Sequence, residues 1–321
     1  MYSNPRILVA GCGAVGSVFG CLLREAGHPV ALLGRESHLT AIRTRGLKLD
    51  GIWGEHYADG FELATQTTDL SDGYDLALIS VKAYDTESMA RAICPVINRD
   101  GLVVSLQNGL GNIEILAEIF GAERSLGANV LVGAMIPASG RVTVTVQAAP
   151  IIIGPLEISD CVMLERIHYW IRAFNHAGIP CEATVRILAY LWAKMLYNAP
   201  LNALGALLQV HYGVLAEAPE LRQIMDRIID ETFSVAERKG VDLLWSTTED
   251  YRSLFYGHLV PSTYNHQSSM LQDLQRGRRT EIDAINGAIW RYGQQLEIPT
   301  PCNEIMTRLI WARERSCKQA N

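Results

Sequence analysis

The sequence predicts an α/β protein whose first domain is built on a parallel sheet and whose second domain is all-α. Two observations carry this prediction. Short apolar segments alternate with helix-like periodicity in the first half of the chain, and from about residue 184 the periodicity is helical almost to the end. Because a single hydrophobic core rarely extends beyond roughly 250 residues, a chain of 321 residues is expected to divide. We expect domains at residues 1–183 and 184–321.

The expected strands of the first domain are short and almost continuously apolar, which is typical of a parallel sheet covered by helices on both faces. They lie at 6–11, 29–34, 75–81, 102–107, 127–136, 141–147 and 150–154. Helices are expected between them near 14–27, 84–94, 111–120 and 160–177. The second domain is expected to contain helices at 185–209, 217–239, 263–296 and 302–318.

A glycine-rich turn, GCGAVG, joins the first strand to the first helix. Gly11 would make the tight turn, Gly13 would let the backbone approach a phosphate, and Gly16 would let the helix pack closely on the strand. The helix N–H groups and dipole can hold a pyrophosphate at this place. The turn therefore indicates a Rossmann-type dinucleotide-binding domain; the alternative is a tight turn in another α/β protein, including a methyltransferase-like one.

The second strand ends in LLGR, with Arg35 where an NAD-binding protein usually has an acidic residue for the ribose 2′-hydroxyl. The planar donors of an arginine match phosphate oxygens, which favours NADP(H) over NAD(H). Glu36 would repel a 2′-phosphate if it pointed the same way. The alternative is that Arg35 is an ordinary surface residue.

Two later strands also end in polar residues. Lys82 follows the third strand and Asn108 follows the fourth. Ligands of open α/β sheets collect at the carboxyl ends of the strands, so both residues are candidates for binding. Taken singly, Lys82 could be a solvent-facing lysine and Asn108 part of an ordinary Asn-Gly turn.

In the second half, AKMLYNAPLN places Lys194, Asn198 and Asn202 at four-residue intervals on one helix. Such spacing forms a polar stripe on an otherwise apolar helix. A lysine buried without a partner costs several kcal/mol, so Lys194 is expected either to be paired or to extend its head into water. Pro200 removes the hydrogen bond to the carbonyl of Leu196 and is expected to kink the helix, which would turn Asn202 off the stripe.

A further pair of polar residues, Ser269 and Glu281, lies in SSMLQDLQRGRRTEIDAINGAI. On a straight helix they would be about 120° apart, so helical spacing does not unite them. All these segments together resemble the ketopantoate reductase (2-dehydropantoate 2-reductase) family, and the resemblance covers nearly the whole chain. The shared segments are GCGAVG, GHPVALLGR, VKAYDT, QNGLGN, LWAKMLYNAPLNAL and SSMLQDLQRGRRTEIDAINGAI.

The resemblance implies an NADPH-dependent reduction of 2-oxopantoate to pantoate, which supplies pantothenate and coenzyme A, with substrate held between a Rossmann domain and a helical domain. It implies that Lys194 is the general acid and Glu281 its catalytic partner. Burial would lower the pKa of the lysine and Glu281 would raise it, and the sequence leaves the balance open. The remaining implied roles are substrate or nicotinamide binding by Asn108, Asn198 and Asn202, substrate carboxylate binding by Ser269, and cofactor binding by Gly11, Gly13, Gly16, Arg35, Lys82 and Asn108.

Two alternatives to this function stay open. A related enzyme could use the same machinery on another 2-oxo acid or ketone, because the motifs that fix the reaction do not touch the tail of the substrate. A non-catalytic NADP-binding sensor could keep the fold without the chemistry. The presence of both Lys194 and Glu281 argues against the sensor.

Composition argues against several other classes of function. The net charge of −6 is unlike that of nucleic-acid-binding proteins, and the sequence shows neither a signal peptide nor an apolar run of about 18 residues. The seven cysteines are scattered without a metal-ligand spacing, which favours reduced thiols and no metal site. We therefore expect a cytoplasmic enzyme that binds neither nucleic acid nor membrane. A homodimer is left open, because the helix expected at 263–296 could bury an apolar face against a second copy.

Overall fold

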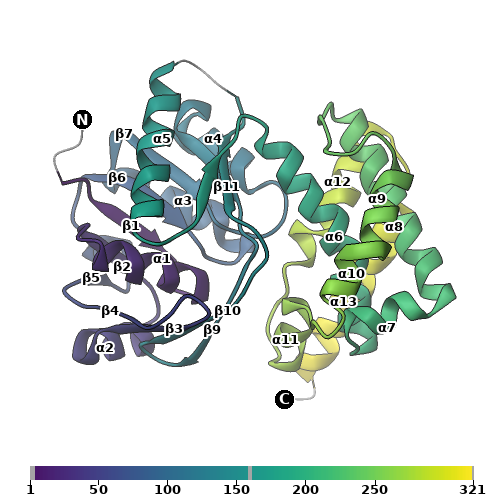
Figure 1. The fold of residues 1–321 in the computed structure, drawn as a ribbon, viewed down its shortest axis with the longest axis horizontal. Helices are drawn as coiled ribbons and strands as arrows, with labels where there is room; N and C mark the ends of the chain where they lie inside the picture. Colours follow the sequence, from purple (N-terminus) through teal and green to yellow (C-terminus); the bar gives the residue numbers. More distant parts are fainter. Residues whose placement is uncertain (1–3, 158–160, 320–321) are drawn as a thin grey trace. The chain divides into compact units, whose positions relative to one another are not determined.

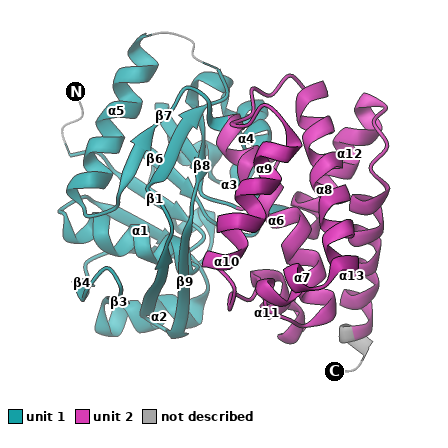
Figure 2. Ribbon diagram, turned by 45° about the vertical axis from the view of Figure 1, so that its right-hand side comes forward, with its two compact units in different colours: residues 1–107, 112–187 teal, residues 108–111, 188–321 magenta. Residues whose placement is uncertain are grey.

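The computed structural model describes residues 4–157 and 161–319, and the chain forms two compact units (Figure 2). Unit 1 contains Met1–Gln107 and Asn112–Ile187, and unit 2 contains Asn108–Gly111 and Leu188–Asn321. The chain therefore enters unit 2 for four residues, returns to unit 1, and enters unit 2 again after Ile187. No sequence pattern indicates this entry into unit 2 for four residues.

Unit 1 is built on an eight-stranded sheet with the order β12-β11-β8-β7-β6-β1-β2-β5 (Figure 1). All neighbouring strands are parallel except β8 and β11. The strands are β1 (Ile7–Ala10), β2 (Val30–Leu33), β5 (Glu62–Ala64), β6 (Tyr74–Ile79), β7 (Ile97–Ser105), β8 (Ser125–Asn129), β11 (Ile151–Pro155) and β12 (Cys181–Ala183).

The order of these strands reverses next to β1, which pairs with β2 on one side and with β6 on the other. From β2 the chain continues outward to β5, and from β6 it continues through β7 to β8 on the opposite side. In open α/β sheets, ligands bind beyond the carboxyl ends of the strands at such a reversal. Gly11 and Lys82 follow β1 and β6, so they lie at the edge where a ligand is expected.

Helices cover both faces of this sheet, as the sequence predicted. Alternate residues of β1 point to opposite faces. Ile7 and Val9 join a core with α1 (Ala14–Glu25), α2 (Glu36–Arg45) and α5 (Cys161–His176), whereas Leu8 and Ala10 join a core with α3 (Thr86–Ile93) and α4 (Asn112–Phe120). The predicted α/β fold of the first half is thereby confirmed.

Unit 1 also contains a four-stranded sheet with the order β4-β3-β10-β9. Its strands are β3 (Leu47–Gly51), β4 (His56–Ala58), β9 (Val132–Ala138) and β10 (Arg141–Gln147). The expected single strand at 127–136 is therefore wrong, because this segment divides into β8 of the large sheet and β9 of the small one. Strand β8 is fully buried and β9 is largely exposed, a difference that a continuous apolar run does not reveal.

Unit 2 is helical, as predicted. Its elements are α6 (Ile187–Leu208), α7 (Tyr212–Glu217), α8 (Pro219–Arg238), α9 (Thr248–Leu254), the π-helical turn η5 (Phe255–Leu259), α10 (Val260–Ser262), α11 (Ser269–Gln275), the 3₁₀ turn η6 (Ile282–Ala284), α12 (Asn286–Leu296) and α13 (Pro301–Gln319). None of the helices that the structure describes is long and apolar enough to cross a membrane.

The continuous helix expected at 263–296 is wrong. Ser268 caps the start of α11, and the helix ends at Gln275, two residues before Gly277, whose φ of +62° is typical of helix termination. Glu281 then precedes η6 in an irregular segment. Glu281 therefore lies on a turn, not on a helix face.

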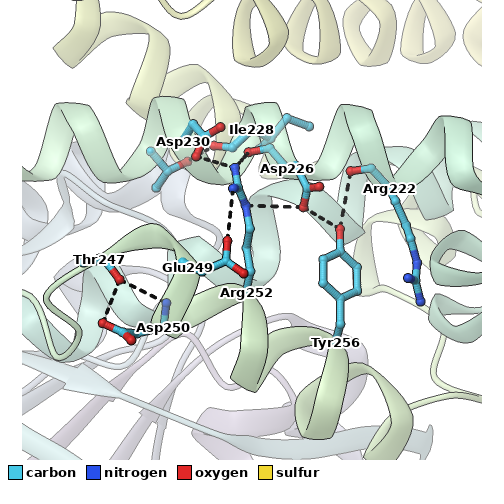
Figure 3. Close-up of polar contacts among 10 residues, drawn as sticks. Arg222, Asp226, Ile228, Asp230, Thr247, Glu249, Asp250, Arg252 and Tyr256 are labelled. Carbon is cyan, nitrogen blue, oxygen red and sulfur yellow. Dashed lines mark hydrogen bonds and ion pairs between the residues drawn. The ribbon is translucent and has the colours of Figure 1, made fainter.

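An arginine fixes α9 and η5 to α8 (Figure 3). Arg252 donates a hydrogen bond to Asp230, and its Nε lies 3.5 Å from Asp226 Oδ1. Tyr256 Oη donates to the same Asp226 carboxylate at 2.8 Å. Because Arg252 and Tyr256 come from successive turns, these contacts hold the irregular π-helical turn against a regular helix.

Candidate functional site

The glycine turn in unit 1 has the geometry that its sequence predicted. Gly11 has a φ of +108°, and a Cβ at this position would lie 2.6 Å from the backbone nitrogen of Val81. Ser80 Oγ donates a hydrogen bond to the Gly11 carbonyl at 2.6 Å. Any side chain at Gly11 would force apart the segments that follow β1 and β6.

The other two glycines meet different requirements. A Cβ on Gly16 would lie 2.3 Å from the Gly11 carbonyl oxygen, so Gly16 allows α1 to pack against the turn. Gly13 precedes α1, is exposed, and would have no atom within 4 Å of an added Cβ. Since no side chain caps α1 at Gly13, the first N–H groups and the positive end of the helix dipole suit a pyrophosphate. The turn therefore fits a dinucleotide.

Arg35 lies at the N-terminal end of α2 and is exposed. Within the described chain its side chain makes no hydrogen bond or ion pair. Glu36 next to it accepts a hydrogen bond from Thr40 Oγ1 at 2.6 Å and lies 3.8 Å from Arg43. Glu36 is thus engaged by residues of its own helix.

Lys82 lies directly before a 3₁₀ turn, η2 (Ala83–Asp85), and is half-buried. It follows β6 at the edge of the sheet where the strand order reverses. This position agrees with contact to a bound cofactor, and that role of Lys82 stays a prediction.

A second group of polar residues lies within unit 2 and is centred on Lys194 of α6. Lys194 Nζ donates a hydrogen bond to Asn108 Oδ1 at 2.7 Å. Asn108 follows β7 in the sequence but belongs to the same compact unit as Lys194. The amide oxygen of Asn108 therefore orients the lysine ammonium.

Burial outweighs the neighbouring charge in setting the pKa of Lys194. Loss of solvation lowers the pKa from its ordinary value of 10.5 to about 8, and the Glu281 carboxylate opposes this by raising it. Glu281 itself is only 8% exposed. An amine with a pKa of about 8 is largely protonated at neutral pH and gives up its proton more readily than an ordinary lysine, which suits general acid catalysis.

The remaining two amides of the α6 stripe have different surroundings. Asn198 is half-buried, and the described residues offer its side chain no hydrogen bond. Asn202 is 5% exposed, and its Oδ1 accepts a hydrogen bond from Tyr212 Oη at 2.5 Å. Because the oxygen of Asn202 is engaged, its Nδ2 group is left as a donor for a ligand.

Ser269 is the exposed first residue of α11. Its neighbour Ser268 is buried and accepts a hydrogen bond from the backbone N–H of Leu271 at 3.1 Å. Ser268 Oγ also donates to the backbone carbonyl of Asn202 at 3.3 Å. Ser268 thus connects α11 to α6, and carboxylate binding by Ser269 stays a prediction.

The structure therefore brings Lys194, Asn108 and Glu281 together in unit 2. The cofactor candidates Gly11, Gly13, Gly16, Arg35 and Lys82 lie in unit 1, whereas Asn108, also a cofactor candidate, lies in unit 2. Sequence reasoning missed Tyr212, because a tyrosine in an apolar helical segment resembles a core residue. Among the residues that the structure describes, no group of three or more His, Cys, Asp or Glu side chains could hold a metal ion.

Two family descriptions match the chain. "Ketopantoate reductase PanE/ApbA" matches residues 7–157, and "Ketopantoate reductase PanE/ApbA C terminal" matches residues 186–314. The 2-dehydropantoate 2-reductase of Aquifex aeolicus is 36% identical over 313 residues, which are 96% of this chain and 97% of that protein. The matches cover both compact units.

Solved structures are also similar over the whole chain. A PanE/ApbA family ketopantoate reductase from Ralstonia eutropha JMP134 is 31% identical with a TM-score of 0.86, and the match covers 98% of this chain and 99% of that one. A D-mandelate dehydrogenase in a ternary structure with NADH and anilino(oxo)acetate has the same TM-score and coverage at 27% identity. The fold is thus shared with enzymes named for different substrates.

Proposed function

The chain belongs to the ketopantoate reductase PanE/ApbA family, and from this premise we propose that it reduces 2-dehydropantoate (ketopantoate) to pantoate with NADPH, a step of pantothenate and coenzyme A synthesis. The observation that carries the proposal is the half-buried Lys194, hydrogen-bonded to Asn108 and influenced by Glu281. This arrangement provides a proton donor whose pKa is near neutrality.

NADPH, held by the glycine turn and Arg35, would supply the hydride for reduction at C2 of the 2-oxo acid. Negative charge then develops on the ketone oxygen, and the protonated Nζ of Lys194 stabilises this charge and donates a proton to it. Asn108 orients the ammonium, while the negative charge of Glu281 raises the pKa of the lysine and so favours its protonated form. Asn198, Asn202 and Ser269 are assigned to substrate binding.

Most of the cofactor residues are assigned from unit 1. Gly11, Gly13 and Gly16 form the turn that would receive the pyrophosphate, and Arg35 would contact the 2′-phosphate. Lys82, and Asn108 from unit 2, are also assigned to cofactor binding. The free guanidinium of Arg35 supports NADPH, because a 2′-phosphate offers it several acceptor oxygens. Reduction also requires the nicotinamide to reach a substrate held by Lys194, so the proposal requires both units to act on one substrate molecule.

A second candidate is reduction of another 2-oxo acid, and the similarity to D-mandelate dehydrogenase favours it. The motifs around Lys194 and Arg35 act on the 2-oxo group and on the cofactor, so they do not choose between substrates. Ketopantoate remains the first choice, because the curated relative from Aquifex aeolicus and the family descriptions are named for that activity.

The test follows NADPH absorbance with ketopantoate, 2-oxoisovalerate, pyruvate and phenylglyoxylate. We expect the highest kcat/KM with ketopantoate. A higher value for another acid would move the assignment to that substrate, and no turnover with any of them would favour a non-catalytic protein. Lys194→Met serves as the inactive control, since it keeps the length of the side chain and removes the proton.

The proposal also includes a cytoplasmic location and leaves the oligomeric state open. The cysteines whose side chains are described are all free thiols, which agrees with a reducing cytoplasm. A homodimer stays a possible assembly, although the helix at 263–296 that suggested it is divided into α11, η6 and α12.

A further inference from the structure

Four residues, Asn108–Gly111, belong to unit 2 although the chain on both sides of them belongs to unit 1. We call this segment the strap. Within unit 2 it lies against η6, where the backbone N–H of Leu110 donates a hydrogen bond to the Ala284 carbonyl at 2.8 Å. The same turn begins after Glu281, and the N–H of Ala284 donates to the Glu281 carbonyl at 3.0 Å. The strap is therefore seated on the turn that carries Glu281.

Gly109 makes the closest approach between the strap and η6. Its φ is +93°, and an added Cβ would lie 2.5 Å from both the Cβ and the carbonyl oxygen of Ala284. Real Cβ atoms do not approach backbone so closely, and a backbone carbonyl cannot rotate away as a flexible side chain can. Any side chain at Gly109 would therefore lift the strap from its seat.

The two residues that flank the strap, Gln107 and Asn112, are both hydrogen-bonded to one hydroxyl group within unit 1. Gln107 Nε2 donates a hydrogen bond to Thr86 Oγ1 at 2.7 Å, and Thr86 Oγ1 donates to Asn112 Oδ1 at 2.8 Å. Gln107, Thr86 and Asn112 are all buried. The strap thus has little freedom to compensate for a displacement at its centre.

We propose that Gly109 is a positioning residue for the reaction: by seating the strap on Ala284 it holds Asn108 Oδ1 where it orients the ammonium of Lys194. The inference rests on the proposed function, since it concerns the alignment of the proposed proton donor. An ammonium has three N–H groups and rotates freely unless acceptors fix it. The hydrogen bond to Asn108 fixes one N–H group, which restricts the directions of the others.

The chain offers a matched control in Gly111. Its φ of +92° is almost the same as that of Gly109, so alanine at either position causes similar backbone strain. An added Cβ at Gly111 would meet only the Tyr292 hydroxyl, at 3.9 Å. The two variants therefore differ in the contact with η6.

The first measurement titrates Lys194 directly and needs no substrate. The chain has five lysines, so labelling with [ε-13C]lysine gives few NMR signals, and Lys194→Met identifies the relevant one. In Gly109→Ala the hydrogen bond to the charged form is lost, so we expect the pKa of Lys194 to fall below its wild-type value. In Gly111→Ala it should not change. Equal titration of Lys194 in both variants would overturn the proposal.

The second measurement is kinetic and uses the 2-oxo acid that the wild-type enzyme reduces best. Gly109→Ala should lower kcat at least tenfold more than Gly111→Ala. Equal kcat values for the two variants would contradict the proposal. If the wild type reduces no 2-oxo acid, the proposed function fails, and the NMR titration still decides whether Gly109 positions Lys194.

If Gly109→Ala does not fold, Ala284→Val replaces it. Valine enlarges the other side of the same contact and should also lift the strap, with a lower Lys194 pKa and lower kcat. A folded Ala284→Val variant with wild-type titration and turnover would equally overturn the proposal.

Discussion

The balance between burial and the charge of Glu281 gives a quantitative prediction about pH. Burial, partly offset by the Glu281 charge, leaves the pKa of Lys194 at about 8 instead of 10.5, a net difference of about 3 kcal/mol at 1.36 kcal/mol for each pH unit. Reduction needs the protonated amine, so kcat/KM should be constant below about pH 8 and then fall tenfold for each pH unit. An ordinary lysine would maintain the rate to about pH 10.

Glu281→Gln perturbs this balance with little change in size. Glu281 raises the pKa of Lys194, so its neutralisation should move the alkaline limb of kcat/KM to lower pH. A nearby opposite charge typically changes a pKa by one to three pH units, and we expect a movement of about one pH unit or more. The reverse reaction needs the neutral amine, so oxidation of the hydroxy acid should instead rise with pH through the same value.

The assay measures kcat/KM from pH 6 to 10.5 in both directions, with Asp283→Asn as a control. Asp283 lies in the same turn as Glu281 but forms an ion pair with Arg279 at 2.9 Å, and its removal should leave the limb in place. A wild-type limb near pH 10, or an unchanged limb in Glu281→Gln, would refute the assignment of Lys194 as a proton donor coupled to Glu281.

Two further predictions concern cofactor choice and substrate binding. Arg35→Met should raise the Kd of NADPH about 10- to 100-fold, because hydrogen bonds to a charged group are worth about 1.5–3 kcal/mol. The Kd of NADH should change less than about twofold. Fluorescence titration measures both constants, and an unchanged ratio of the NADPH Kd to the NADH Kd would refute the phosphate contact. Tyr212→Phe removes the donor that fixes Asn202 Oδ1. The KM of the 2-oxo acid should therefore rise several-fold, with kcat nearly constant. An unchanged KM would argue against a role of Asn202 in substrate binding.

The parts of the fold that could be predicted from the sequence are those set by neighbouring residues. The GCGAVG turn is one, since Gly11 has a φ of +108° and Gly16 packs against the Gly11 carbonyl and Val9, all within one strand–turn–helix segment. The division of residues 127–136 into β8 and β9 could not be predicted, because the two strands pair with different partners, β7 and β10. Local apolar character does not encode which partner a strand finds.

The residues of the candidate site also differ in how far the sequence could predict them. The four-residue spacing of Lys194 and Asn198 identified a polar stripe, and the family resemblance added Glu281. Neither could show that Asn108, placed by the sequence in the first domain, is grouped with unit 2 and accepts the Lys194 hydrogen bond. That contact joins residues 86 positions apart, and it depends on the seating of Gly109 on η6, for which no local pattern exists.

Pro200 shows how the rest of unit 2 supports the stripe. Although proline cannot donate a helix hydrogen bond, α6 continues to Leu208. Next to the proline, Asn286 Nδ2 donates to the Ala199 carbonyl at 3.0 Å and to Asn303 Oδ1 at 3.0 Å, and Asn303 Nδ2 donates to Glu231 Oε2 at 2.7 Å. Side chains from α12, α13 and α8 therefore fix α6 beside Pro200, which cannot donate a backbone hydrogen bond to the Leu196 carbonyl. Asn286 and Asn303 are fully buried, so replacing Asn286, Asn303 or Glu231 by an apolar residue would leave buried polar groups without a partner. The rigidity of α6 therefore depends on several helices of unit 2.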